Sequence, residues 1–191
     1  PSLQGYDGSQ ARGFYEDVAR AASGLAGVDS LGYADSAPIQ LGTQQWGVEI
    51  DGYVPAANER MNLDFAIVSP GYFETLRIPL LAGREFGAED HAEGQGALIV
   101  NQTMARRFWP ESDPIGRPIR TGGRDRIVVG IVADSKVYSL GEGPSAFMYF
   151  PYEQMDPATP LTLFVRTQQD PLALIEPLRA AVRALDPAPP L

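Results

Sequence analysis

The chain has 191 residues, 44% of them hydrophobic and 20% charged, and its formal net charge is −9. This length suffices for one large domain or two small ones with a buried core. The acidic excess argues against a nucleic-acid partner, because phosphate binding needs a basic face. With no cysteine and a single histidine, His91, the sequence offers no disulfide and no cysteine- or histidine-based metal cluster.

Neither end of the chain looks like the natural end of a protein. The sequence begins at Pro1 without methionine and stops at Leu191, directly after two prolines. No signal peptide is recognisable, and no apolar run approaches the roughly 18 residues of a membrane-spanning helix. We therefore expect a segment cut from a longer protein.

Periodic patterns predict a mixture of helices and strands. The first helix is expected after a cap at Asp7 or Ser9, with Phe14, Val18 and Leu25 on its apolar face. Strands are expected at residues 28–34, 45–53, 61–68, 97–100, 117–121, 126–133, 146–150 and 161–166.

Two more helices are predicted in the second half of the chain. One should cover residues 102–109, with Asn101 as its cap. The last should open at Asp170, and Pro177 should kink it or delay its start. Its predicted core face consists of Leu174, Leu178, Val182 and Leu185.

Residues 68–86 form a central segment that connects the predicted elements before it with those after it. Ser69 and Pro70 follow a predicted strand and suit a helix start, as cap and first helical residue. Pro79 should stop this short helix, and Gly83 should relieve a turn after it. The segment carries no catalytic pattern, so we interpret it as a structural joint.

The polar side chains do not assemble into an enzyme site. Asp125 and Asp134 stand at opposite ends of one predicted strand, roughly 30 Å apart at about 3.3 Å per residue, too far for joint acid–base catalysis. Ser135 and Lys136 are adjacent, so on an extended chain they point to opposite faces. We therefore predict no catalytic residue and no cofactor.

Two loops carry candidate binding residues. Glu89, Asp90 and Glu93 surround His91, but their spacing matches no established metal loop, so a solvated acidic loop at residues 87–96 is the better interpretation. No metal site is predicted. A later loop exposes apolar side chains and is a candidate partner surface, formed by Val137, Tyr138 and Leu140.

Several segments resemble one known family in sequence and in order. They are residues 68–86, 99–110, 113–117, 128–134, 149–152, 163–167 and 185–187. Together they resemble the periplasmic core domain of MacB-type ABC transporter permeases (MacB-like/FtsX-like permeases). The motif sequences are most similar to those of large soil-bacterial (acidobacterial-type) permeases with a duplicated organisation. The resemblance covers nearly the whole chain.

The resemblance implies a two-lobed α+β fold. Residues 1–82 and 146–191 would build a porter-like lobe of βαβ units, and residues 83–145 would build a smaller mixed α/β lobe inserted into it. The whole chain would then be one extracytoplasmic domain.

The resemblance also implies a function. The domain would lie on the periplasmic side of a bacterial inner membrane, anchored by transmembrane helices of the same permease chain. It would be non-catalytic, transmitting conformational change driven by a separate cytoplasmic ATPase, docking a periplasmic adaptor or an exported substrate, or both. Pro79, Gly83 and Arg84 would form a hinge where the chain crosses between lobes.

Two other functions stay open at this point. One is a soluble or secreted module that binds a small ligand between the lobes. The other is a hydrolase of unknown type, although no nucleophile–base pair in the sequence supports it.

Overall fold

The computed structural model describes residues 8–37, 44–136 and 143–185. The strands are β1 (Ser30–Ala34), β2 (Gln44–Ile50), β3 (Asn62–Val68), β4 (Leu80–Gly83), β5 (Ala97–Asn101), β6 (Pro118–Thr121), β7 (Arg124–Val132), β8 (Phe147–Pro151) and β9 (Thr162–Arg166). The α-helices are α1 (Gly8–Ser23), α2 (Tyr72–Leu76), α3 (Gln102–Phe108) and α4 (Ile175–Leu185). Short 3-10 helices are η2 (Ala88–Asp90), η3 (Tyr152–Gln154) and η4 (Pro171–Leu174).

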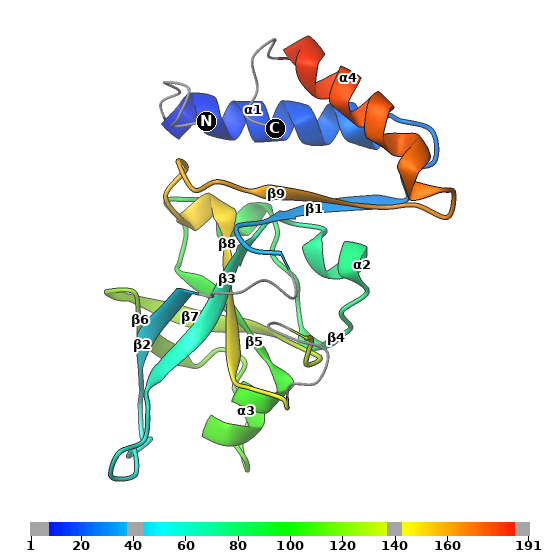
Figure 1. The fold of residues 1–191 in the computed structure, drawn as a ribbon. Coiled ribbons are helices and arrows are strands. Elements are labelled where there is room, and N and C mark those ends of the chain that lie inside the picture. The colour runs from blue at the N-terminus through cyan, green and yellow to red at the C-terminus, as the bar shows by residue number, and fades with distance from the viewer. Residues whose placement is uncertain (1–7, 38–43, 137–142, 186–191) are drawn as a thin grey trace.

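Six of the strands close into a barrel (Figure 1). The sheet runs in the order β2-β6-β7-β5-β8-β3, and β3 pairs again with β2, which joins the two edges. The ladders β3–β8 and β5–β7 are parallel, whereas the other ladders of the ring are antiparallel. Closure leaves the ring without open edges, so its backbone groups pair within the barrel.

The alternation of side chains along the barrel strands sorts them into two cores. In β8, Met148 and Phe150 belong to the core inside the ring, whereas Phe147 and Tyr149 belong to a second core against α2. Strands β3 and β5 divide their side chains in the same way. These strands therefore read as continuous apolar runs because both of their faces are covered.

A second part of the molecule lies above the barrel in Figure 1. Strands β1 and β9 pair antiparallel, and α1 and α4 pack together on the far side of this pair. These two helices form the helix layer. Tyr15 of α1 holds the layer to its strands, because its carbonyl accepts a hydrogen bond from Tyr33 and its hydroxyl from the Leu161 amide. No described helix is long and apolar enough to span a membrane.

Most predicted elements are confirmed within a few residues. Asn101 caps α3 by accepting a hydrogen bond from the Met104 amide, and Met104, Ala105 and Phe108 are the buried side of that helix. The β6–β7 hairpin turns at Gly122, as the Gly-Gly pair predicted. Its second strand is central, since it pairs with β4, β5 and β6.

The predicted start of the short helix after β3 was wrong. Helix α2 begins at Tyr72 and is preceded by Gly71 at φ 80°, so neither Ser69 nor Pro70 occupies the expected position. The hydroxyl oxygen of Ser69 instead accepts a hydrogen bond from the Tyr33 amide of β1. The serine side chain is engaged by the neighbouring strand, and the left-handed glycine makes the turn.

The end of this helix also differs from the prediction. The helix stops at Leu76, and Arg77 adopts the left-handed conformation before Pro79 is reached. After Pro79 the chain forms an edge strand, β4, where a turn was expected.

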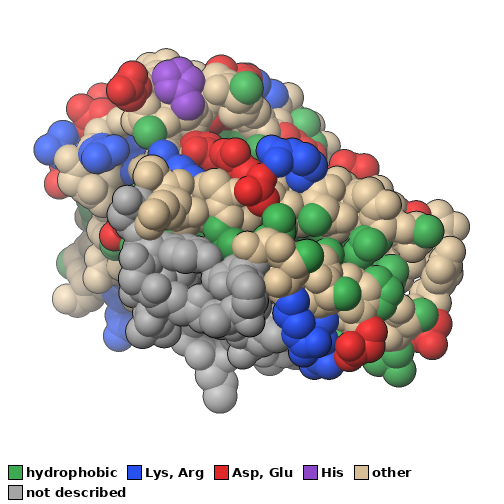
Figure 2. Space-filling model, turned by 90° about the horizontal axis from the view of Figure 1, so that it is seen from above, with side chains coloured by type: hydrophobic (Ala, Val, Ile, Leu, Met, Phe, Trp, Pro, Cys, Tyr) green, Lys and Arg blue, Asp and Glu red, His purple; other side chains and the backbone are tan. Residues whose placement is uncertain are grey.

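The predicted core face of the last helix was only partly correct. Leu174 is buried, but it belongs to η4, and α4 starts at Ile175 with Pro177 in its first turn, so the expected delay is confirmed. No residue of α4 is buried, and Leu185 is exposed. The face of the molecule seen from above, shown in Figure 2, accordingly carries hydrophobic side chains among charged ones.

The α+β, two-lobed character of the fold is confirmed. The predicted lobe boundaries are crossed by several ladders: β4 pairs with β7, β5 with β8, and β6 with β2. The division into residues 1–82 with 146–191 and residues 83–145 stays a prediction.

Candidate functional site

The predicted hinge lies between the helix layer and the barrel. On one side α2 packs against β1 and β9, and the Arg166 side chain of β9 donates a hydrogen bond from Nε to the Thr75 carbonyl at 2.6 Å. On the other side β4 pairs with β7. The carbonyl of Pro79 accepts a hydrogen bond from the Ala133 amide at 2.9 Å. The segment is thus one of the covalent connections between two packed parts.

Gly83 is held in a conformation that excludes a side chain. Its φ is +73°, in the left-handed region that L-residues resist. A Cβ atom there would overlap the Val129 carbonyl oxygen and would also lie 2.9 Å from the Ile115 side chain. Glycine at this position therefore allows β4 to approach β7 closely.

Arg84 anchors the chain immediately after β4. Its guanidinium donates two hydrogen bonds to the Asp90 carboxylate, at 2.7 and 2.9 Å, and lies 3.2 Å from a Glu89 carboxylate oxygen. Burial raises the pKa of Asp90, but hydrogen bonds from Arg84 and from the Gly87 amide outweigh it and leave the pKa below its ordinary value. Hydrogen bonding to Asp90 raises the pKa of Arg84.

This pair corrects the prediction of a fully solvated acidic loop. Asp90 is buried against Arg84, whereas His91 is exposed and visible as the purple side chain in Figure 2. The described residues hold no cluster of three or more His, Asp or Glu side chains that could bind a metal ion. The candidate partner surface formed by Val137, Tyr138 and Leu140 lies outside the described residues.

The other polar candidates are engaged in structural contacts. Asp125 pairs with Arg120 at 3.0 Å across the β6–β7 hairpin. Asp134 accepts hydrogen bonds from both the amide and the hydroxyl of Thr103 at the start of α3. The Ser135 hydroxyl lies 3.1 Å from that of Tyr149. The structure does not bring any of these groups together as a catalytic set.

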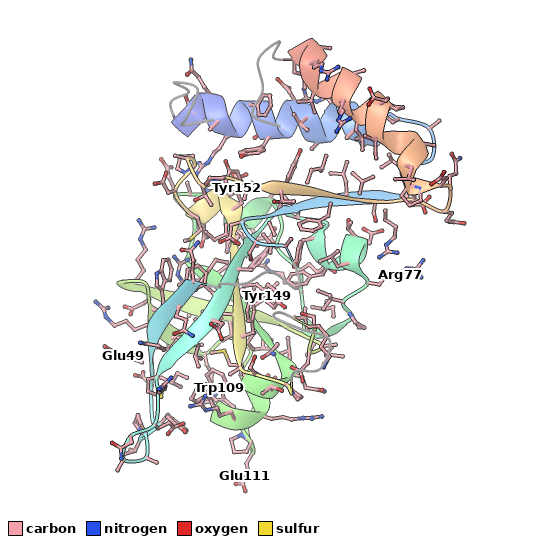
Figure 3. All side chains as sticks on the ribbon, in the orientation of Figure 1. Glu49, Arg77, Trp109, Glu111, Tyr149 and Tyr152 are labelled. Atoms are coloured by element: carbon pink, nitrogen blue, oxygen red, sulfur yellow. The ribbon has the colours of Figure 1, made fainter. Side chains whose placement is uncertain are left out.

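A cleft that the sequence analysis missed opens where α1 meets one end of the barrel. It has a volume of about 460 Å³ and is lined by Arg12, Trp46, Arg124, Arg126 and Met155, among others. Figure 3 places Tyr152 at this junction, just beneath α1, and Tyr149 deeper in the molecule. Arg12 spans the junction by donating hydrogen bonds to the carbonyl of Glu153, within η3, and to that of Met155, directly after η3.

Arg126 is the unusual residue of this cleft, because only 2% of its surface is exposed. Its guanidinium lies 4.7 Å from the centre of the Phe150 ring. Nη1 donates to the Gln154 side-chain oxygen at 3.4 Å, and Nη2 donates to the Met155 sulfur at 3.7 Å. Within the described residues it forms no ion pair, and its Nε has no hydrogen-bond partner. Burial, together with the charge of Arg124, lowers the pKa of Arg126 to about 10.

One signal in the sequence could have revealed Arg126. It is two residues before Val128, and residues two apart on a strand share a face. An arginine in phase with the apolar positions of a central strand is expected to be buried. Other lining residues come from α1, β2, η3 and the segments around Ala92 and Gly122, which no local pattern connects.

Curated relatives match about two thirds of the chain. It is 28% identical over 130 residues to the "Probable export ATP-binding/permease protein MacB" of Pseudomonas entomophila, which covers 68% of this chain and 18% of that protein. It is also 28% identical over 132 residues to the "Probable syringafactin export ATP-binding/permease protein SyfD" of Pseudomonas syringae, covering 69% and 19%. The chain spans about a fifth of the length of these relatives.

Solved structures share the fold. The extracellular domain of the noncanonic ABC-type transporter YknZ from Gram-positive bacteria matches with a TM-score of 0.58 and 19% identity, over 90% of this chain and 81% of that one. The periplasmic region of MacB from Actinobacillus actinomycetemcomitans matches with a TM-score of 0.61 and 14% identity, over 88% and 72%. Residues 5–185 match the family described as the MacB-like periplasmic core domain, and the chain therefore belongs to that family.

Proposed function

We propose that this domain is the extracytoplasmic, non-catalytic part of an ABC-type transporter permease. The observation that carries the proposal is the match of residues 5–185 to the MacB-like periplasmic core domain. The relatives named as export ATP-binding/permease proteins are several times longer than the chain. The membrane helices and the separate cytoplasmic ATPase belong, in this proposal, to the rest of the transporter.

The position of the two ends supports attachment to a membrane on one side. The first and last described residues, Gly8 and Leu185, belong to α1 and α4, which pack together above the β1–β9 pair (Figure 1). A domain inserted between two consecutive membrane helices has to bring both connections to the same face. We propose that the α1–α4 side faces the membrane and the α3 end of the barrel points away from it.

The proposed role is to transmit ATP-driven movement and to dock an adaptor or an exported substrate. A continuous set of contacts supports transmission, since α2 rests on β1 and β9 while β4 rests on β7. Movement of the α1–α4 layer would reach the barrel through Pro79, Gly83 and Arg84. We propose these residues as the hinge.

The absence of cysteine from the chain makes the location directly testable. Val54 is 88% exposed in the loop after β2, so Val54→Cys in the full-length permease gives a single reporter within the domain. We expect a membrane-impermeant maleimide to label it in intact spheroplasts. Labelling that requires permeabilised membranes would overturn the proposed location. A matched variant, Val100→Cys, should stay unlabelled in both states, because Val100 is buried in the barrel and cysteine is close to valine in size.

The hinge can be tested with two reporters. Leu172 is 72% exposed beside α4, so Val54→Cys and Leu172→Cys carry spin labels on the barrel and on the helix layer. We expect their distance distribution in the full-length permease to change between the nucleotide-free and ATP-bound states. An unchanged distribution would exclude bending between the two parts.

A further inference from the structure

The Arg126 cleft combines a buried cation with an apolar wall. The Trp46 ring lies 5.2 Å from Phe150, the ring over which the Arg126 guanidinium sits, and Met155 lines the same cleft. A buried charge is costly unless an opposite charge and hydrogen bonds compensate it. Among the described residues, no carboxylate forms an ion pair with Arg126, and the positive charge of Arg124 acts on it unfavourably. The cleft therefore favours an anion.

The other charged side chains of the cleft indicate which kind of anion it would bind. Glu153 and Asp156 also line it, and Glu153 lies 3.8 Å from the Nε of Arg12. These two carboxylates oppose a dianion such as phosphate more strongly than a monoanion. A guanidinium also matches a carboxylate with two parallel hydrogen bonds. A volume of about 460 Å³ lies within the range of small-molecule sites.

We propose that this cleft binds an organic carboxylate, whose carboxylate pairs with Arg126 and whose apolar body rests on Trp46 and Met155. Arg12 and Arg124 add positive charge at the rim. The proposal of this binding site depends on the geometry and charges of the cleft and not on the proposed transport role. The two proposals can therefore be tested separately. It also joins α1 to the barrel, because Arg12 comes from the helix layer and Arg126 from β7.

Two-dimensional NMR of the isotope-labelled chain provides the test. The chain has two tryptophans, and only Trp46 lines the cleft, whereas Trp109 is buried at the end of α3. We expect naphthoate to shift the Trp46 indole signal saturably, with a dissociation constant below about 1 mM, and to leave the Trp109 signal in place. Naphthamide, which has the same rings without the charge, should cause no saturable shift.

Variants then assign the binding to Arg126. Arg126→Met should weaken naphthoate binding at least about tenfold, whereas Arg106→Met, at an exposed arginine of α3, should not change it. The Trp109 signal reports whether Arg126→Met is folded. If it is not, Arg12→Met and Arg126→Lys serve instead, and both should bind more weakly than the unmodified chain.

Four results would overturn the proposal. They are no saturable Trp46 shift up to about 10 mM naphthoate, an equal response to naphthamide, an equal response to inorganic phosphate, and unchanged binding in the folded arginine variants.

Discussion

The barrel and the helix layer bury their apolar side chains to different degrees. Every residue of Phe147–Pro151 in the barrel is buried, because the ring interior covers one face of the strand and α2 the other. In α4 no residue is buried, although its apolar side chains recur at helical spacing. Hydrophobic stabilisation grows with the apolar area removed from water. The barrel strand β8 therefore contributes more to the free energy of folding than α4, which is held mainly along one side by α1.

Truncation of a barrel side chain should have the largest effect and test this difference. Phe65 is 1% exposed and packs edge-on against Phe150, so Phe65→Ala should lower the free energy of unfolding by about 3–5 kcal/mol. Val182→Ala in the half-buried face of α4 should cost less than about 1 kcal/mol. Urea denaturation of both variants provides the measurement. Similar losses would show that α4 contributes as much to the free energy of unfolding as the barrel does.

A side chain at the link between the two parts should have the next largest effect. Gly83→Val forces a branched residue into φ +73° and against the Val129 carbonyl, so we expect a loss of about 3 kcal/mol. His91→Ala, at an exposed loop position nearby, should leave the melting temperature unchanged. Near-zero shifts for both variants would contradict the hinge proposal.

Loss of the Asn101 side chain should have an intermediate effect confined to the barrel. Its oxygen accepts hydrogen bonds from the amides of Met104 and Phe147, and its nitrogen donates to the Ser145 carbonyl. Asn101→Ala leaves these groups without a partner inside the protein, so we expect a loss of about 2 kcal/mol. Asn101→Asp retains the two acceptor contacts and should recover part of the stability, which thermal denaturation of the two variants would reveal.

The smallest predicted effect depends on pH. Hydrogen bonds from Tyr53 and Arg107 lower the pKa of Glu59 from 4.5 to about 2. A carboxyl whose pKa is lower in the folded state stabilises the fold above its unfolded pKa and loses this contribution as the pH falls through its folded pKa. Glu59→Gln should therefore lower the melting temperature near neutral pH, and its difference from the unmodified chain should shrink between about pH 4.5 and 2. A difference independent of pH would exclude this contribution.

The local patterns in the sequence were sufficient for most of the elements. The cap at Asn101 and the turn at Gly122 depend on neighbours within a few residues, and the structure confirms both. The apolar run that became β7 was correctly predicted as a central strand. Family resemblance also led correctly to the two-lobed α+β fold and the family, because ordered motifs carry information that local periodicity lacks.

The predictions that failed concern contacts that helical or strand periodicity does not encode. Ser69 was expected to cap a helix, but its side chain accepts a hydrogen bond from Tyr33, far away in the sequence. The strand β4 was missed because its four residues are all exposed and only the pairing with β7 makes it a strand. Asp90 was assigned to solvent because nothing local showed that Arg84 would turn toward it.

The sequence by itself determined the family, the fold class and the positions of most helices and strands, since these depend on side-chain spacing and short-range backbone preferences. Only the tertiary structure decided that β2 pairs with β6 and β3 with β8 to complete the barrel, that Gly83 abuts Val129, and that the Arg126 guanidinium lies over Phe150. The physical reason is that each of these features joins segments far apart in the chain. Strand pairing and burial are set by packing of the whole domain, which no short stretch of sequence specifies.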